Sequence, residues 1–293
     1  MKNKTLILIA LISAGVFSAK ASETDAMLTA ESDSVETLRP VFSAYQLTAG
    51  SSHSADTYLS PLKYDGWSAG FGYQRLQAMK FDPLKWVMQL KFDVSFSRTL
   101  SPSRNSTLLY AGIDGSWAMM RRWRLPYNLS VGVGPGVSLD AGCYYMSRNG
   151  NNPASAKASL TIDASAYASW STRIASIPIT LRYQAQLPVT GAFFSPDYGE
   201  LYYEIYLGNH SGLAHCAWWG NYLNYNHQLT ADINLGSTSL RIGYEGKYLS
   251  TKVNDLVTHS FKHSAIIGIS CEWFTLSYKR PLSTQAKIIS ATY

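Results

Sequence analysis

Long runs of strictly alternating apolar and polar residues most constrain how this chain can fold. From Leu84 to Ser97, one parity carries Leu, Trp, Met, Phe and Val, and the other carries Lys, Val, Gln, Asp and Ser. Successive side chains of a β-strand point to opposite faces, so this segment has one apolar and one polar face. Similar runs cover 127–145, 158–170 and 223–235. The pattern predicts an all-β, antiparallel sheet with one dry and one wet face.

The length of these runs distinguishes a membrane barrel from a soluble sandwich. They last about 12 to 19 residues, whereas strands of soluble domains have about five or six. A strand tilted near 45° needs about 9–11 residues to cross the hydrocarbon. The wet parity carries charges in mid-strand, which the polar interior of a membrane barrel accepts and a sandwich core does not. We therefore expect a transmembrane β-barrel whose lumen holds these charges, namely Lys91, Asp93, Asp163, Arg182, Asp232, Arg241 and Glu245.

The aromatic residues give an independent indication. If the strands alternate in direction from Val41, one group of aromatics falls at the periplasmic ends of strands and another at the outer ends. The periplasmic group is Trp86, Trp117, Tyr127, Trp170 and Trp273, and the outer group is Trp67, Tyr145, Tyr225 and Tyr248. Two belts of Trp and Tyr at the water–lipid boundaries are typical of membrane barrels.

Twelve strands are expected, with ten as the alternative if the final hairpin is misread. They cover 41–51, 66–76, 84–98, 107–119, 127–147, 157–171, 177–187, 222–234, 238–250, 259–272, 274–280 and 286–293. Short connections should be periplasmic and long ones extracellular, which puts both termini in the periplasm. Ile289, Ala291 and Tyr293 share one parity of the last strand. A terminal strand that ends in an aromatic residue is the kind of signal that the barrel-assembly machinery reads, so this machinery is an expected partner.

The segment 188–221 is expected to be one long extracellular excursion. Its stretch 200–207 also alternates. If it crossed the membrane, the tight turn 235–237 would lie outside and the loop 208–221 would lie on the periplasmic side, contrary to the placement of short and long connections given above. It should therefore form a projecting hairpin or an inward-folded plug. The excursion is rich in aromatics: Phe193, Phe194, Tyr198, Tyr202, Tyr203, Tyr206, Trp218 and Trp219. These side chains can stack on sugars or lipids or pack the loop together; packing is favoured because such groups are costly to leave wet.

The first residues predict export. Lys2 and Lys4 precede a short apolar run, and Ala19-Lys20-Ala21 forms a small-x-small cleavage site, so 1–21 is expected to be a signal peptide. Its apolar core is too short to span a bilayer as a helix. The polar, acidic stretch that follows predicts a flexible periplasmic tail over 22–40, ahead of a barrel over 41–293.

Charge and cysteine content narrow the partners. Removal of the signal peptide takes away three lysines and lowers the formal charge from +6 to about +3. Neither this balance nor the scattered Lys and Arg indicates a nucleic-acid partner; outer-membrane lipids are expected instead. Three cysteines exclude a disulfide-stapled scaffold. A disulfide between Cys143 and Cys216 is disfavoured, because the parity of Cys143 predicts that its side chain faces lipid.

Two classes of function remain open from the residues: a structural or narrow-pore barrel, and a lipid-modifying hydrolase of the phospholipase or lipid A deacylase type. His227, His259 and His263 lie on apolar parities near outer strand ends, but Ser260 and Ser264 take the opposite parity. A metal site from His210 and His215 with Asp197 or Glu200 lacks a tight ligand spacing. We therefore expect no catalytic residues, metal or cofactor, and no enzyme.

Several loop motifs carry a resemblance. They are Asp56-Thr57-Tyr58-Leu59-Ser60-Pro61, the block Asn151-Asn152-Pro153-Ala154-Ser155-Ala156-Lys157-Ala158, Phe194-Ser195-Pro196-Asp197-Tyr198-Gly199 and Ser277-Tyr278-Lys279-Arg280. Together they resemble an uncharacterised family of exported Gram-negative proteins known as domain of unknown function 3316. The resemblance covers nearly the whole mature chain and implies compartment and architecture, but no activity.

Overall fold

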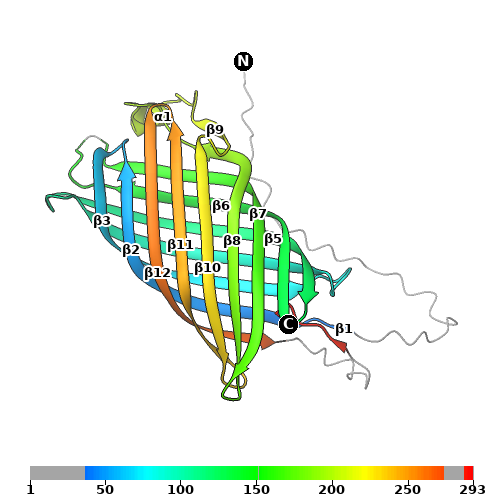
Figure 1. Cartoon of the computed structure of the whole chain (residues 1–293). Helices are drawn as coiled ribbons and strands as arrows, with labels where there is room; N and C mark the ends of the chain where they lie inside the picture. The colour runs from blue at the N-terminus through cyan, green and yellow to red at the C-terminus, as the bar shows by residue number, and fades with distance from the viewer. Residues whose placement is uncertain (1–36, 151, 274–286, 293) are drawn as a thin grey trace, which may run out of the picture. The chain divides into compact units, whose positions relative to one another are not determined.

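The computed structural model describes residues 37–150, 152–273 and 287–292, and most of them form one closed antiparallel sheet (Figure 1). Among these described residues, ten strands make up the wall of a barrel. The wall strands are β2 (Val41–Asp56), β3 (Ser60–Ala78), β4 (Trp86–Leu100), β5 (Thr107–Leu125), β6 (Leu129–Tyr145), β7 (Ala154–Ile174), β8 (Ile177–Phe194), β10 (Tyr222–Asn234), β11 (Ser239–Val253) and β12 (Leu256–Trp273). Each wall strand pairs with the next wall strand in the chain. The wall is closed by β12, which pairs with the full length of β2.

Four short elements lie outside the wall. The helix α1 (Tyr202–Tyr206) and the strand β9 (Ala214–Ala217) both belong to the connection between β8 and β10, and β9 pairs with the end of β8. The strand β1 (Thr37–Leu38) pairs in parallel with β13 (Lys287–Ile288). No helix of the described residues is both long and apolar enough to cross a membrane.

The barrel has two distinct ends. We call one the loop end: it carries the connections 57–59, 101–106, 146–153, 195–221 and 254–255. The opposite end is the terminal end, where β2 begins, β12 ends and the connections 79–85, 126–128, 175–176 and 235–238 lie. Figure 1 shows α1 and β9 at the loop end and β1 at the terminal end.

The wall is apolar outside and polar inside. In β4, the outward-facing Phe92 is 44% exposed, whereas Gln89 on the opposite face of the same strand is 6% exposed. The same alternation buries serine, threonine, glutamine and charged side chains along every wall strand. The predicted all-β barrel with a polar interior is therefore the observed fold, and the wet parity of the sequence is the lumen.

The predicted count of twelve strands is wrong, and the alternative of ten is correct. The predicted strand 274–280 lies outside the described residues. The predicted strand 286–293 does not join the wall, because β12 already pairs with β2. Instead, Ala291 enters the terminal end of the lumen, where it packs in a buried cluster with Phe42, Ala44, Leu76 and Val87. The alternation of Ile289 and Ala291 reflects burial inside the barrel rather than contact with lipid.

Further segments differ from the sequence prediction. The strand β5 continues to Leu125, beyond the predicted end at 119, and β3 extends beyond both ends of the predicted strand 66–76. Residues 200–207 do not cross the wall, as expected, but 202–206 form a helix rather than a strand. The strand β8 continues to Phe194, beyond the predicted end at Leu187, because β9 extends the sheet beside it. The predicted signal peptide 1–21 and most of the tail 22–40 lie outside the described residues; of that tail, Thr37 and Leu38 are paired with β13.

Candidate functional site: the charged lumen

The middle of the lumen holds a row of three carboxylates, which we call the carboxylate row: Asp93 of β4, Asp114 of β5 and Asp140 of β6. They lie side by side because Asp93 is the register partner of Asp114, and Asp114 that of Asp140. Three adjacent carboxylates repel one another in a low-dielectric interior. The row therefore needs a cation from another part of the wall.

Lys247 of β11 supplies that cation. Its Nζ lies 3.1 Å from Oδ2 of Asp114, 3.4 Å from Oδ2 of Asp93 and 4.0 Å from Oε1 of Glu245. Since β11 is not a neighbour of β4 or β5 in the sheet, this lysine spans the lumen. Lys262 of β12 also reaches across and donates to Oγ of Ser95 at 3.2 Å.

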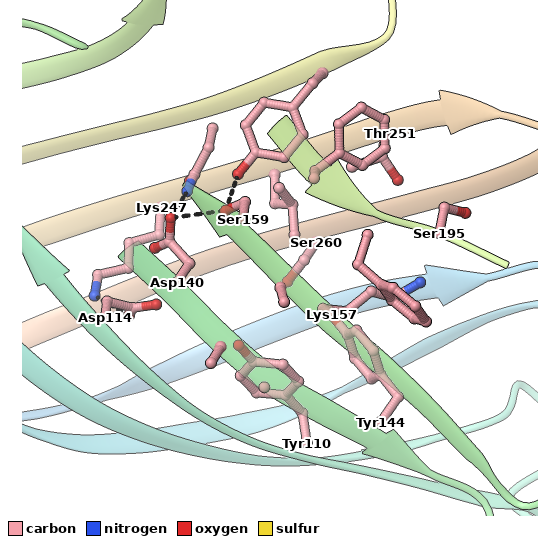
Figure 2. Close-up of a pocket in the computed structure, with 18 of the residues that line it drawn as sticks. Tyr110, Asp114, Asp140, Tyr144, Lys157, Ser159, Ser195, Lys247, Thr251 and Ser260 are labelled. Atoms are coloured by element: carbon pink, nitrogen blue, oxygen red, sulfur yellow. Dashed lines mark hydrogen bonds and ion pairs between the residues drawn. The ribbon is translucent and has the colours of Figure 1, made fainter. Parts of the chain in front are cut away.

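A cavity of about 70 Å³ lies on the loop-end side of the carboxylate row. Figure 2 shows Asp140, Ser159 and Lys247 on one side of it and Tyr110 and Tyr144 on another. The hydroxyl of Ser159 donates to Asp140 at 3.1 Å, and Asn224 donates to the same carboxylate at 3.3 Å. A space of this size holds a few water molecules and no large solute. Side chains thus fill most of the lumen at this level.

The loop end carries a hydrogen-bonded cluster, which we call the cap and define as Asp56, Tyr58, Asn152, Lys157 and Tyr202. The Tyr58 hydroxyl donates to the carbonyl of Glu200 at 2.7 Å and accepts from Asn152. The Tyr202 hydroxyl accepts from the amide of Ala156 at 2.6 Å, and its ring meets that of Tyr58 edge-on at 5.7 Å. Lys157 pairs with Asp56 at 3.0 Å. Burial raises the pKa of the Tyr58 hydroxyl and of the Tyr202 hydroxyl, which keeps both protonated.

The terminal end of the lumen contains a second ion pair. Arg241 is fully buried and donates to both carboxylate oxygens of Asp232, each at 2.8 Å. Its third contact is with Oε1 of Gln74 at 2.7 Å, across the lumen on β3. Ser270 adds a hydrogen bond to Asp232 at 2.7 Å. Nε, Nη1 and Nη2 of Arg241 and both carboxylate oxygens of Asp232 thus all have hydrogen-bond partners, and the two residues form a bidentate pair.

The structure places all seven predicted lumen charges on the inner face of the wall. Asp93 and Glu245 face Lys247, Asp232 faces Arg241, and Lys91 lines the same small cavity as Asp93 and Glu245. Asp163 accepts from Thr161 and Gln186, at 2.8 and 2.7 Å. Pairing is not purely across the lumen, since Asp232 and Arg241 are register partners on adjacent strands. Arg182 has no hydrogen-bond partner for its guanidinium group.

The sequence reasoning missed the residues that organise the site: Asp114, Asp140, Lys157, Lys247 and Lys262. All five stand on the wet parity of long alternating runs, the same signal that identified the other charges. Sequence alone does not show which of them meet, because that depends on how the strands are staggered around the barrel.

The predicted interface aromatics lie on the outer face, in two groups. The first group lies toward the terminal end. Its members at strand ends are Trp86, Trp170 and Trp273, and Tyr127 lies in a connection there. Trp117 lies opposite Leu90 in the same half of the wall. Trp67, Tyr145, Tyr225 and Tyr248 lie in the half toward the loop end.

The aromatics of the excursion divide between burial and exposure. Phe193 is buried and packs with Ala217 and Tyr222, Phe194 is half-buried, and Tyr202 belongs to the cap. The sequence predicts that these aromatics pack the loop together, but the remaining ones are largely exposed: Tyr198, Tyr203, Tyr206, Trp218 and Trp219.

The histidines form no hydrolase constellation. His263 is bonded through Nδ1 to the hydroxyl of Tyr244 at 2.6 Å, on the outer face, whereas Ser260 and Ser264 face the lumen. Within the described ranges, no hydrogen bond joins a serine hydroxyl to a histidine ring.

No group of metal-ligating residues is found in the described part of the chain. His215, one of the residues weighed as a ligand, contacts the carbonyl of Ser195 at 3.1 Å. Cys143, Cys216 and Cys271 are all free thiols.

Comparison with known proteins gives a family and two distant structures. A family model described as "Protein of unknown function (DUF3316)" matches residues 5–280. The crystal structure of the outer membrane protease OmpT from Escherichia coli is similar with a TM-score of 0.47 at 6% identity, covering 80% of this chain and 97% of that one. The transport unit of the autotransporter AIDA-I from Escherichia coli is similar with a TM-score of 0.38 at 9% identity, covering 80% and 90%. No curated protein matches the chain.

Proposed function

The chain belongs to the family described as protein of unknown function (DUF3316), and for this member we propose an outer-membrane barrel that is sealed by its own side chains and acts through its loop-end surface. In this proposal the chain is exported with a cleaved signal peptide, contacts outer-membrane lipids and is inserted by the barrel-assembly machinery. The loop end faces outward and the terminal end faces the periplasm.

The outer face supports a membrane location. Large apolar side chains stay exposed along the wall, among them Leu47, Phe71, Phe92, Phe96, Ile113, Val137, Leu139, Leu160, Ile162, Ile267 and Ile269. A soluble monomer rarely exposes more than a few hundred Å² of contiguous apolar surface. In a membrane, lipid chains would cover this face and keep it out of water. Every wall strand is also long enough to cross the hydrocarbon.

The observation that carries the proposal is the bridge from Lys247 to Asp93 and Asp114 across the lumen. An open channel needs a continuous aqueous path, but here charged side chains join strands on different sides of the lumen, and the hydrogen-bonded cap lies above them. We infer that the barrel conducts poorly and that any specific role resides in residues 188–221 and the neighbouring loops.

The first test measures conductance in planar bilayers. The wild-type protein should show no conductance steps of open-porin size, because the lumen is bridged. The double variant Asp114→Ala/Lys247→Ala removes one charge of each sign from the bridge and should raise the single-channel conductance several-fold. Its matched control is Lys63→Ala/Asp65→Ala, which removes the same two charges from the exposed outer side of β3 and should leave the conductance unchanged. A wild-type conductance as large as an open porin's would refute the sealed lumen.

The second test replaces residues 196–213 with a short Gly-Ser link. The wall should still assemble, because β8 pairs directly with β10 from Gln186↔Asn226 to Ile179↔Ile233 without help from the loop. Heat-modifiable migration on a gel reports the folded barrel. Deletion of β10, Tyr222–Asn234, is the control that removes a wall strand and should abolish the folded band. Loss of this band in the loop replacement would show that the excursion is part of the barrel's folding unit.

A lipid-modifying hydrolase is the competing function, and the side-chain geometry does not favour it. On the outer face, His53 bonds to an aspartate and His263 to a tyrosine, whereas Nδ1 of His227 and Nδ1 of His259 have no hydrogen-bond partner in the described part of the chain. None of them is bonded to a serine nucleophile. Phospholipid and lipid A turnover by the purified, folded protein would decide the matter. We expect no product above that of a heat-denatured sample; sustained turnover would replace the sealed-barrel proposal.

A further inference from the structure

Arg182 of β8 is a buried cation that forms no salt bridge with any residue of 37–150, 152–273 or 287–292. It is 2% exposed, and Nε, Nη1 and Nη2 all lack a hydrogen-bond partner. Its guanidinium carbon lies 4.0 Å from the centroid of the Tyr167 ring. A cation–π contact offsets only a small part of the cost of burying an unpaired charge. A buried guanidinium group whose charge is not neutralised by a carboxylate can bind an anion, unlike an arginine that is already held in an ion pair.

Other hydrogen-bond donors around Arg182 also lack partners. They are the Ser169 hydroxyl, the Tyr167 hydroxyl and Nε2 of Gln228. The sheet register places them together: Ser169 is the partner of Arg182 on β7, and Tyr167 and Gln228 flank Gln184, two residues along β8. Four neighbouring side chains of β7, β8 and β10 thus present N–H and O–H groups, and together they match an acceptor with several oxygens.

The carboxylates of this region are already engaged. Asp232 is bound by Arg241 and Ser270, and Glu272 accepts from Ser290 at 2.5 Å and from Thr292. Neither acid is hydrogen-bonded to Arg182. The positive charge of Arg182 is therefore left for a ligand.

A cavity of about 160 Å³ adjoins two of these donors, Arg182 and Ser169. It is also lined by the two engaged acids, Asp232 and Glu272, and by Thr180, Gly236 and Ser237, the last two from the connection between β10 and β11. Residues of that connection lie at the terminal end of the barrel, so the cavity lies toward that end. The wall strands separate it from the outer face, which favours a free solute over a lipid headgroup.

From these observations we propose that the terminal end of the lumen binds a small oxyanion, of the phosphate or sulfate type, through Arg182 and Ser169. The planar guanidinium fork matches two oxygens of such an ion, and the serine hydroxyl donates to a third. The site is separate from the carboxylate row and does not depend on the barrel being sealed.

Calorimetric titration of the folded, full-length protein with inorganic phosphate tests this site. The protein is kept in detergent at low ionic strength, with sulfate, acetate and chloride as parallel titrants. We expect saturable binding of phosphate and sulfate, weaker binding of acetate and none of chloride. Arg182→Gln should weaken phosphate binding at least tenfold, and Ser169→Ala should weaken it less. Arg98→Gln, which removes the same charge from an exposed position of β4, should bind like the wild type.

Thermal unfolding gives a second readout that does not depend on heat of binding. Phosphate should raise the unfolding temperature of the wild type and leave that of Arg182→Gln unchanged. In phosphate-free buffer Arg182→Gln should unfold at a higher temperature than the wild type, because an unpaired buried charge is gone. Absence of phosphate binding by the wild type, or equal binding by Arg182→Gln with the folded gel band intact, would overturn the proposal.

Discussion

Replacing Asp232 with leucine should destabilise the folded barrel by about 3–5 kcal/mol, because the change leaves a buried arginine unpaired. Arg241 is 0% exposed and directs two of its nitrogens at Asp232, each at 2.8 Å. Leucine is of similar size but accepts no hydrogen bond. The guanidinium would retain only Gln74 as an acceptor. Denaturant-induced unfolding in detergent, followed by tryptophan fluorescence, measures the loss.

Two further variants show whether the loss comes from the unpaired charge. Asp82→Asn breaks the exposed pair of Asp82 and Lys85, whose charged atoms are 3.6 Å apart, and should cost about 1 kcal/mol or less. The double variant Asp232→Leu/Arg241→Met removes both buried charges and should recover most of the stability lost in Asp232→Leu. If the double variant is as unstable as Asp232→Leu, the damage comes from lost packing and the account of this pair is wrong.

The wall could be predicted from the sequence because both of its faces are uniform over many residues. Leu90, Phe92 and Val94 point outward and Gln89, Lys91 and Asp93 point inward, and no other arrangement of an alternating run satisfies both sets. Register within each hairpin then follows from short connections such as Asn254-Asp255, where both residues have a positive φ, as two-residue hairpin turns require.

The chain's C-terminal part could not be predicted in the same way. Ile289 and Ala291 alternate like residues of a wall strand, yet both are buried, and Ala291 packs inside the lumen against Phe42 and Leu76. Alternation indicates which side chains are shielded from water, but not whether lipid or protein covers them.

The excursion shows the other limit of periodicity. In 200–207 the apolar residues also recur with the spacing of one helical turn, Tyr202 to Tyr206, so a short segment fits a helix as well as a strand. The helix is favoured locally by Glu204, whose carboxylate accepts from the amide of Leu201 at 3.0 Å.

For the lumen, parity identified the candidate charges, but the contact of Lys247 with Asp114 depends on the stagger of distant strands.

The close approach of β6 to β5 at Gly134 leads to the second large expected effect: Gly134→Ala should prevent folding or destabilise the barrel by about 3 kcal/mol or more. The register of β5 and β6 is interrupted between Ala118↔Gly136 and Arg121↔Val133. A Cβ on Gly134 would lie 2.1 Å from the carbonyl oxygen of Met119 and 2.7 Å from Cα of Met120. Both are backbone atoms, so no side-chain rotation relieves the overlap.

Relief of that overlap requires the two strands to move apart, which would disturb the inner packing around this point. Met120 is fully buried there and packs with Ala118 and Tyr167, the same tyrosine that lies against Arg182. The matched control is Gly115→Ala, in the same strand pair, where the nearest atom to an added Cβ is the carbonyl oxygen of Leu139 at 4.0 Å. Gly115→Ala should keep the wild-type folded band and unfolding midpoint. If Gly134→Ala also keeps both, β6 does not approach β5 as closely as the structure shows, and the glycine is not required for closing the wall at this point.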